Sequence, residues 1–325
     1  MEDQKNTSPD GRPEQDGVLM EIRSGYASHG DIELHYEDLG DPRDPAVLLI
    51  MGLGAQLVLW HNDFCQKLVD LGYRVVRFDN RDVGLSTKLH GQRTDGKLIP
   101  NLLRSFVGLP SPSVDRLEDM ADDALAVLDH LGIERAHVVG ASMGGMIAQI
   151  VAARCPQRVA GLGIIFSSNN SPLLPPPTHK ALMALIKGPP PNSPRDVIVD
   201  NAVRVSKIIG SPAYPKADDQ IRADAIERYD RCFYPQGIGR HFSAVLGSGS
   251  LGRYDKQIAA PTVVIHGRAD KLMRPSGGRA IADAIPGARL VLLDGMGHDL
   301  PEPLWDDIIA ELDSTFALCT DGPLH

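Results

Sequence analysis

Short apolar runs alternate with amphipathic stretches along most of the chain. The clearest run is Ala46–Met51, whose unbroken apolar character predicts a strand covered on both faces. Residues 115–131 carry apolar side chains at helical spacing and predict an amphipathic helix. Further strands are predicted at 18–27, 31–37, 74–78, 136–139, 162–166, 262–266 and 289–293, and further helices at 60–71, 146–154, 277–285 and 304–318. This alternation predicts an α/β protein with a mostly parallel sheet between two helical layers.

The middle of the chain, residues 167–260, has a different character. Its prolines gather in the stretch 172–194, and proline cannot take part in the interior of a sheet ladder. Short helices are predicted over 178–187, 195–209 and 218–229. We interpret this segment as an inserted helical cap, because a structureless connection of such length is rare in compact domains. The predicted organisation is a flexible tail (1–17), a core (18–166 and 261–318), the cap (167–260) and a C-terminal tail (319–325).

Composition narrows the range of partners. The formal charge is −9 and the isoelectric point is near 5.6. Phosphate backbones bind basic surfaces, so these values argue against a nucleic-acid partner. The four cysteines are far apart and form no CxxC pair, which favours reduced, mostly buried thiols over a zinc site or a disulfide scaffold.

Neither a secretory signal nor a spanning helix is evident. The first 17 residues are polar, and no apolar run reaches the roughly 20 residues that a membrane span needs. We therefore expect a cytosolic protein, with peripheral membrane contact left open. The sequence carries no signal for a particular oligomeric state.

The strongest chemical signal is Gly140-Ala-Ser-Met-Gly144, a G-x-S-x-G pattern. It follows the apolar run 137–139 and precedes a predicted helix that opens at about Met146, the strand–turn–helix setting of a nucleophile elbow. The flanking glycines leave room for the neighbouring chain where the turn is tightest. We predict Ser142 as a nucleophile.

A serine hydroxyl needs a base, and the base needs a carboxylate to orient it. Strand 262–266 leads into Gly267-Arg-Ala-Asp270, and strand 289–293 leads into Asp294-Gly-Met-Gly-His298. The order Ser142, Asp270, His298 is the one that this arrangement requires. Asp294 and Asp299 are the rival carboxylates.

The tetrahedral intermediate of acyl transfer also needs hydrogen-bond donors for its oxyanion. Two backbone N–H groups supply them in this setting, one after the nucleophile and one from the loop after an early strand. The corresponding residues are Met143 and Leu53, the latter within the loop 51–54.

Five segments together resemble α/β-hydrolases of the aclacinomycin-methylesterase type, and in particular the Lip-type carboxylesterases of mycobacteria. The segments are Met51–Ala55, Asp79–Ser86, Gly140–Gly145, Gly267–Asp270 and Gly297-His298. The resemblance covers about residues 26–316. It implies an α/β-hydrolase fold and hydrolysis of carboxylic esters without a metal ion or an organic cofactor. One departure is that Met51 stands where many relatives have the histidine of a His-Gly pair.

Other residues near these motifs have less specific roles. Gln56 and Trp60 lie just beyond the oxyanion loop and are candidates for the acyl-pocket wall, although apolar side chains there are as often core. Leu182 and Leu185 belong to an apolar cap helix that either packs on the core or contacts an acyl chain. For Arg81 and Asp82 we favour a structural role, tying their loop to neighbouring backbone.

We therefore expect a serine hydrolase that forms an acyl-enzyme on Ser142 and cleaves a small-molecule or lipid-like ester or thioester. Carbon–carbon bond hydrolysis, cofactor-free haloperoxidation and aminopeptidase activity are alternatives on the same fold. A binding module that has lost catalysis is a further alternative from a different class. The intact set of nucleophile, base and acid disfavours it.

Overall fold

The computed structural model describes residues 21–92 and 98–319. Eight strands form a single sheet in the order β1-β2-β4-β3-β5-β6-β7-β8. The first two strands form an antiparallel hairpin, β2 pairs antiparallel with β4, and all later pairs are parallel. The strands are β1 (Ile22–His29), β2 (Ile32–Leu39), β3 (Ala46–Ile50), β4 (Arg74–Phe78), β5 (Ala136–Ala141), β6 (Val159–Ile165), β7 (Thr262–Gly267) and β8 (Arg289–Leu293). The predicted fold class, with a mostly parallel sheet, is confirmed.

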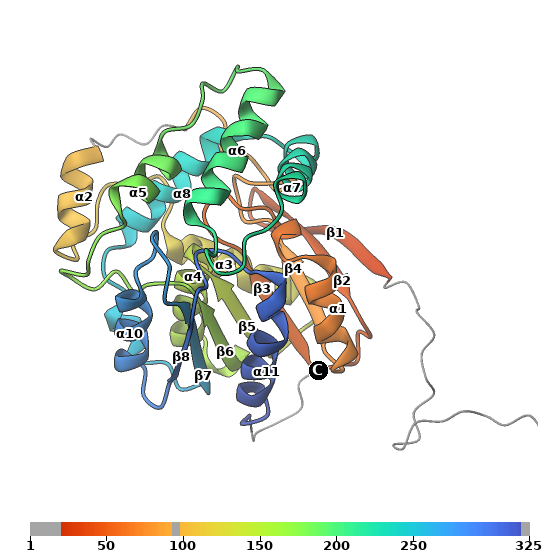
Figure 1. The fold of residues 1–325 in the computed structure, drawn as a ribbon. Helices are drawn as coiled ribbons and strands as arrows, with labels where there is room; N and C mark the ends of the chain where they lie inside the picture. Colours follow the sequence, from red (N-terminus) through yellow and green to blue (C-terminus); the bar gives the residue numbers. More distant parts are fainter. Residues whose placement is uncertain (1–20, 93–97, 320–325) are drawn as a thin grey trace, which may run out of the picture.

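Helices cover both faces of the sheet (Figure 1). On one face, α3 (Leu117–His130), α4 (Met143–Arg154) and α10 (Pro275–Ala284) enclose an apolar core. On the other face, α1 (Asn62–Asp70) and α11 (Trp305–Phe316) enclose a second core. Every residue of β3 to β7 is buried, which accounts for the continuous apolar runs in these strands.

Each predicted strand of the sheet is present, with shifted ends. The first begins at Ile22, and residues 18–20 of its predicted range lie outside the described residues. Helix α4 begins at Met143, directly after Ser142, and not at the predicted Met146. Gly144 and Gly145 lie in the first turn of this helix, where close packing leaves no room for larger side chains.

The segment 167–260 holds the helices α5 (His179–Ile186), α6 (Arg195–Ile209), α7 (Asp218–Arg231), α8 (Pro235–Ser248) and the short α9 (Gly252–Asp255). The first four lie together over one end of the sheet, near α2 (Leu98–Phe106), in Figure 1. Helices α2, α8 and the short α9 are not among the predicted helices. Three glycines lower the helix propensity of α8, and burial of most of its length overrides that preference. The division of the chain into core and cap stays a prediction.

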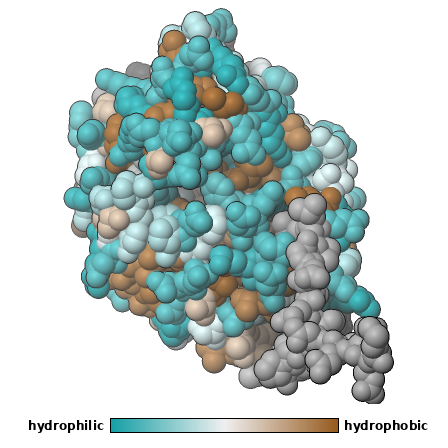
Figure 2. Space-filling view, turned by 45° about the vertical axis from the view of Figure 1, so that its right-hand side comes forward, coloured by the Kyte–Doolittle hydropathy of each residue, from teal (hydrophilic) through white to brown (hydrophobic). Residues whose placement is uncertain are grey.

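On the face drawn in Figure 2, hydrophilic residues predominate and hydrophobic ones occur in small scattered groups. None of the helices in residues 21–92 and 98–319 combines the length and the apolar character of a membrane span. The four cysteines form no disulfide; Cys65 is buried, and the other three are half-buried, less than was expected.

Asp255 is an unusual carboxyl group in the layer beside the sheet. It is fully buried in α9, and Asn169 Nδ2 donates to its Oδ2 at 2.7 Å. Its Oδ1 has no partner among the described residues. Burial raises the pKa of Asp255 to about 7, an effect that the Asn169 hydrogen bond opposes.

Asp255→Asn is expected to change how stability depends on pH. A raised folded-state pKa favours folding below the unfolded-state pKa, and this contribution is lost as pH rises through the folded-state value. Between about pH 4 and pH 7 the wild type should therefore lose up to about 4 kcal/mol relative to the variant. Urea unfolding at a series of pH values measures this difference. The exposed Asp307→Asn is the control, and parallel curves for Asp255→Asn and wild type would contradict the account.

Candidate active site

Ser142 occupies a sharp turn between β5 and α4. Its backbone has φ 56° and ψ −120°, a conformation that is strained for a residue with a side chain. The turn is held from both sides, because Ser142 N donates to Ile165 O at 2.9 Å and Ser167 Oγ donates to Ser142 O at 2.6 Å. The predicted elbow geometry is thus present, with the serine at the beginning of the helix.

The glycines around Ser142 are required by close contacts. A Cβ atom on Gly140 would lie 2.2 Å from Gly144 O, and one on Gly144 would lie 2.0 Å from Ile50 O. Both distances are far below van der Waals contact. The G-x-S-x-G pattern therefore reflects the tight packing of the elbow against the end of β3.

Ser142, His298 and Asp270 lie in hydrogen-bonding order. His298 Nε2 is 3.0 Å from Ser142 Oγ, and His298 Nδ1 is 2.7 Å from Asp270 Oδ2. Asp270 follows β7, and His298 lies in the loop after β8. The three strand ends meet at the same edge of the sheet because β5, β6, β7 and β8 are parallel.

The Asp270 carboxylate is buried and well supplied with donors. Its Oδ1 accepts hydrogen bonds from Leu272 N at 2.8 Å and Met273 N at 2.9 Å. Burial alone would raise the pKa of Asp270, but His298 and His266 outweigh it and lower that pKa to about 2. The group is therefore ionised at neutral pH, as a partner for the His298 ring requires.

The two rival carboxylates have other partners. Asp294 is almost fully exposed and forms an ion pair with Arg268 at 2.7 Å. Asp299 pairs with the hydroxyl of Ser211, which in turn accepts from Gly297 N at 2.8 Å. The Asp299 carboxylate thus accepts a hydrogen bond from Ser211 and helps to hold the loop that carries His298. It is not the carboxylate that pairs with the His298 ring.

Residues of the segment 167–260 also hold His298. Its backbone N–H donates to Ile209 O, at the end of α6, at 2.8 Å. The Phe166 ring packs against the imidazole with the ring centroids 4.7 Å apart. The backbone of His298 is therefore held by a residue of this segment, and its ring is packed by Phe166, the residue just before the segment.

Leu53 and Met143 line the same cavity as Ser142. Within the described part of the chain, no acceptor is hydrogen-bonded to the backbone N–H of either residue. Met143 N is free because it opens α4, where first-turn N–H groups have no partner inside the helix. Asn80 Nδ2 donates to Met51 O at 2.9 Å and fixes the beginning of the Leu53 loop.

Sequence reasoning did not identify the residue that anchors the other end of this loop. His241, buried in α8, accepts a hydrogen bond from Gly54 N at 3.0 Å through Nδ1. Its Nε2 is 2.7 Å from Arg81 O and donates to it. An imidazole that accepts at one nitrogen and donates at the other is neutral. Burial lowers the pKa of His241, which favours this neutral form. A histidine in an unpredicted, glycine-rich helix carried no recognisable signal.

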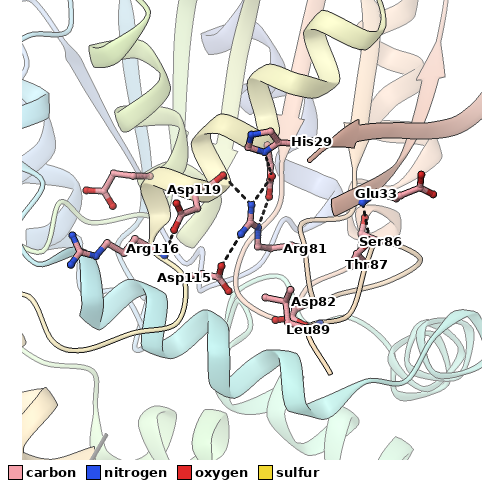
Figure 3. Close-up of polar contacts among 12 residues, drawn as sticks. His29, Glu33, Arg81, Asp82, Ser86, Thr87, Leu89, Asp115, Arg116 and Asp119 are labelled. Carbon is pink, nitrogen blue, oxygen red and sulfur yellow. Dashed lines mark hydrogen bonds and ion pairs between the residues drawn. The ribbon is translucent and has the colours of Figure 1, made fainter. Parts of the chain in front are cut away.

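Figure 3 shows how the Arg81 loop is held in turn. The Arg81 guanidinium bonds both oxygens of Asp123, at 2.6 and 2.7 Å, and Asp115 at 2.7 Å. Asp82 pairs with Arg240 of α8 at 2.6 Å. Neither Arg81 nor Asp82 lines the cavity that contains Ser142, which agrees with the structural role expected for both residues. The loop is held mainly by their side-chain ion pairs and less by contacts with neighbouring backbone.

A cavity of about 1080 Å³ contains Ser142 and His298. Leu182 and Leu185 of α5 line this cavity, where they could contact an acyl chain, as one of the two interpretations of this helix requires. Gln56 lies on its wall, but its Nε2 donates to Arg228 O and Cys232 O, each at 2.8 Å.

Trp60 is not part of the cavity wall. It has no exposed surface and packs against Phe64 in the core beside α1. The prediction that Trp60 forms part of the acyl-pocket wall is therefore wrong, and the alternative that it belongs to the core is correct. Among the described residues, no group of three or more His, Cys, Asp or Glu side chains is placed to hold a metal ion.

Comparison with known proteins identifies the family of the chain. Residues 45–302 match the family model described as alpha/beta hydrolase fold, and the chain belongs to that family. The chain is 28% identical to rhodomycin D methylesterase DnrP of Streptomyces peucetius, over 88% of this chain and 95% of the relative. It is 29% identical to 2-hydroxy-6-oxononadienedioate/2-hydroxy-6-oxononatrienedioate hydrolase of Paraburkholderia xenovorans, over 83% and 85%. The resemblance to methylesterases of this fold is thus confirmed.

A solved structure shows the same fold. Esterase RhEst1 from Rhodococcus sp. ECU1013 superposes with a TM-score of 0.70 at 16% identity, covering 92% of this chain and 99% of the esterase.

The His241 contacts lead to a stability prediction. His241→Leu leaves Gly54 N–H and Arg81 C=O without a partner, so the free energy of unfolding should fall by about 2–4 kcal/mol. His241→Asn keeps an acceptor for Gly54 N–H, and the loss should be about half as large. Urea denaturation measures both. The exposed His179→Leu serves as the control, expected to stay within about 0.5 kcal/mol of wild type. Equal stabilities for the His241 and His179 variants would contradict the anchoring role.

Proposed function

We propose that the protein hydrolyses carboxylic esters through an acyl-enzyme formed on Ser142. The observation that carries the proposal is the hydrogen-bonded series Ser142 Oγ, His298 Nε2, His298 Nδ1 and Asp270 Oδ2, which opens into a large cavity. The methylesterase name of a relative that covers most of the chain supports an ester as the bond cleaved.

The reaction begins when Ser142 Oγ attacks the ester carbonyl carbon while His298 Nε2 takes the hydroxyl proton. Collapse of the tetrahedral intermediate breaks the ester bond, and His298 returns the proton to the leaving alcohol. Water then attacks the acyl-enzyme with His298 again as base, releasing the acid and free Ser142. Asp270 keeps Nδ1–H in place and stabilises the imidazolium that forms in each half.

Leu53 N–H and Met143 N–H bind the oxyanion of both intermediates. Each such donor can contribute roughly 3 kcal/mol to transition-state stabilisation, provided that it is already oriented before reaction. Asn80 and His241 supply that orientation for the Leu53 loop, at Met51 O and Gly54 N respectively. The loop thus has two anchors, neither of which is the histidine that Met51 replaces.

The segment 167–260 supplies part of the pocket. Leu182 and Leu185 of α5 and Ile198 and Val199 of α6 line the cavity, so an acyl or alcohol group would lie against apolar side chains. A volume of about 1080 Å³ is larger than short esters need and admits bulky or long-chain substrates. The proposed substrates are small-molecule or lipid-like esters and thioesters.

Ser142→Ala tests the nucleophile. The variant should fold like the wild type and lose about 10⁶-fold in kcat for p-nitrophenyl esters, because the acyl-enzyme cannot form. Circular dichroism and thermal melting establish the fold, and a spectrophotometric assay measures turnover. A folded Ser142→Ala protein with near-normal turnover would exclude the mechanism.

The carboxylate assignment has a matched pair of variants. Asp270→Asn should lower kcat roughly 10⁴-fold, because the amide favours the wrong tautomer of His298. Asp294→Asn, at the exposed rival, should stay within about 2-fold of wild type, since surface changes rarely reach a buried site. Steady-state kinetics on the same ester compares them. A larger loss in Asp294→Asn than in Asp270→Asn would reverse the assignment.

A further inference from the structure

Arg228, near the end of α7, lines the cavity that contains Ser142. Protein atoms surround its side chain densely, and the residue keeps some accessible surface. No hydrogen-bond acceptor or carboxylate is paired with its guanidinium in residues 21–92 and 98–319. A partly desolvated charge is stabilised by an opposite charge, so an unpaired guanidinium in a cavity wall favours an anionic ligand.

The other deeply placed arginines show how this chain treats such groups. Each forms an ion pair with a carboxylate: Arg74 with Asp38, Arg77 with Glu37, Arg81 with Asp123, Arg231 with Asp79 and Arg240 with Asp82. Arg228 differs from all five. Among the described residues, the Arg228 guanidinium is therefore available to a molecule that enters the cavity.

The nearest carboxylates form no ion pair with Arg228. Asp224, one turn earlier in α7, forms its ion pair with Lys216, and Glu227 is exposed. Burial lowers the pKa of Arg228, and Asp224 and Glu227 act in the opposite direction from a distance. An arginine keeps its charge at neutral pH through such shifts.

The α7 helix does not depend on this guanidinium for its position. The Gln56 amide binds the last turn of α7 through Arg228 O and Cys232 O, and Arg231 Nη1 donates to Gln56 Oε1 at 2.9 Å. The backbone of Arg228 is thus held in place while its side chain is left for the cavity. A guanidinium presented in this way binds a carboxylate with two parallel hydrogen bonds.

We propose that Arg228 forms an anion subsite and that the preferred substrates are esters carrying a carboxylate in addition to the ester group. This inference rests on the proposed ester hydrolysis at Ser142 and adds the charge of the substrate. The apolar walls formed by Leu182, Leu185 and Ile198 suit the hydrocarbon part of such a molecule.

Two substrate series test the proposal. The first pairs p-nitrophenyl hemiesters of dicarboxylic acids from glutaric to sebacic with p-nitrophenyl esters of monocarboxylic acids of equal length, which places the anion on the acyl side. The second pairs the butyrate ester of 4-hydroxybenzoate with that of 4-methylphenol, which places it on the leaving group. For each pair, kcat/KM is measured for the anionic and for the neutral ester, and the rate of the Ser142→Ala protein is subtracted from both. The quantity compared between variants is the ratio of kcat/KM for the anionic ester to kcat/KM for the neutral ester.

Arg228→Gln should lower this ratio about 10- to 100-fold in at least one series, since charge-assisted hydrogen bonds are lost. Arg228→Lys should keep part of the preference for anionic esters, because lysine keeps the positive charge but lacks the planar guanidinium. The control is Arg222→Gln, an exposed arginine on the same helix paired with Asp200, and it should keep the wild-type ratio. Thermal melting of Arg228→Gln should show no loss of stability, because no protein partner is left unpaired.

The outcomes separate the two claims. If the wild type hydrolyses neutral and anionic esters and Arg228→Gln leaves both ratios unchanged, the anion subsite is overturned while ester hydrolysis stands. A lowered melting temperature in Arg228→Gln with unchanged ratios would assign the side chain to structure and would also overturn the proposal. Absence of Ser142-dependent turnover on every ester of both series would overturn the proposed function itself.

Discussion

The structure depends on one backbone constraint, the strained turn at Ser142. A residue with φ near 56° must be held by its surroundings, and here the turn is packed against the ends of β3 and β6. That packing excludes any side chain at Gly140 and Gly144 and brings the elbow against the Leu53 loop. The position of the Ser142 hydroxyl and the position of the proposed oxyanion donors are therefore set by the same contacts.

The segment 167–260 takes part in this arrangement. His241 of α8 bonds Gly54 and Arg81, and Ile209 and Ser211 bond the loop that carries His298. Two of the loops at the site are thus held by residues that none of the sequence motifs include. The segment supplies no member of the Ser142–His298–Asp270 series, yet it contributes to the geometry of the proposed oxyanion donors and of His298. This is a larger role than that of a pocket cover alone.

Much of the fold could be predicted because its central strands, β3 to β7, are buried on both faces, and such strands leave continuous apolar runs. Ser142, Asp270 and His298 could be predicted because each follows a strand end that the sheet brings to one edge. Helix α8 could not, since its three glycines oppose helix formation and its burial in the folded protein overrides that preference. The direction of the Trp60 side chain depends on packing against α1, and the isolation of Arg228 depends on which carboxylates lie near it in space. Neither property is local in sequence.

The most direct test of the central claim is to trap the covalent enzyme. A fluorophosphonate reacts with an activated serine, so the intact mass should show one adduct per chain, and peptide mapping should place it on Ser142. Labelling should be absent in Ser142→Ala and should fall together with esterase activity in Asp270→Asn. An esterase-active protein that carries the adduct on another residue, or carries none, would contradict the account.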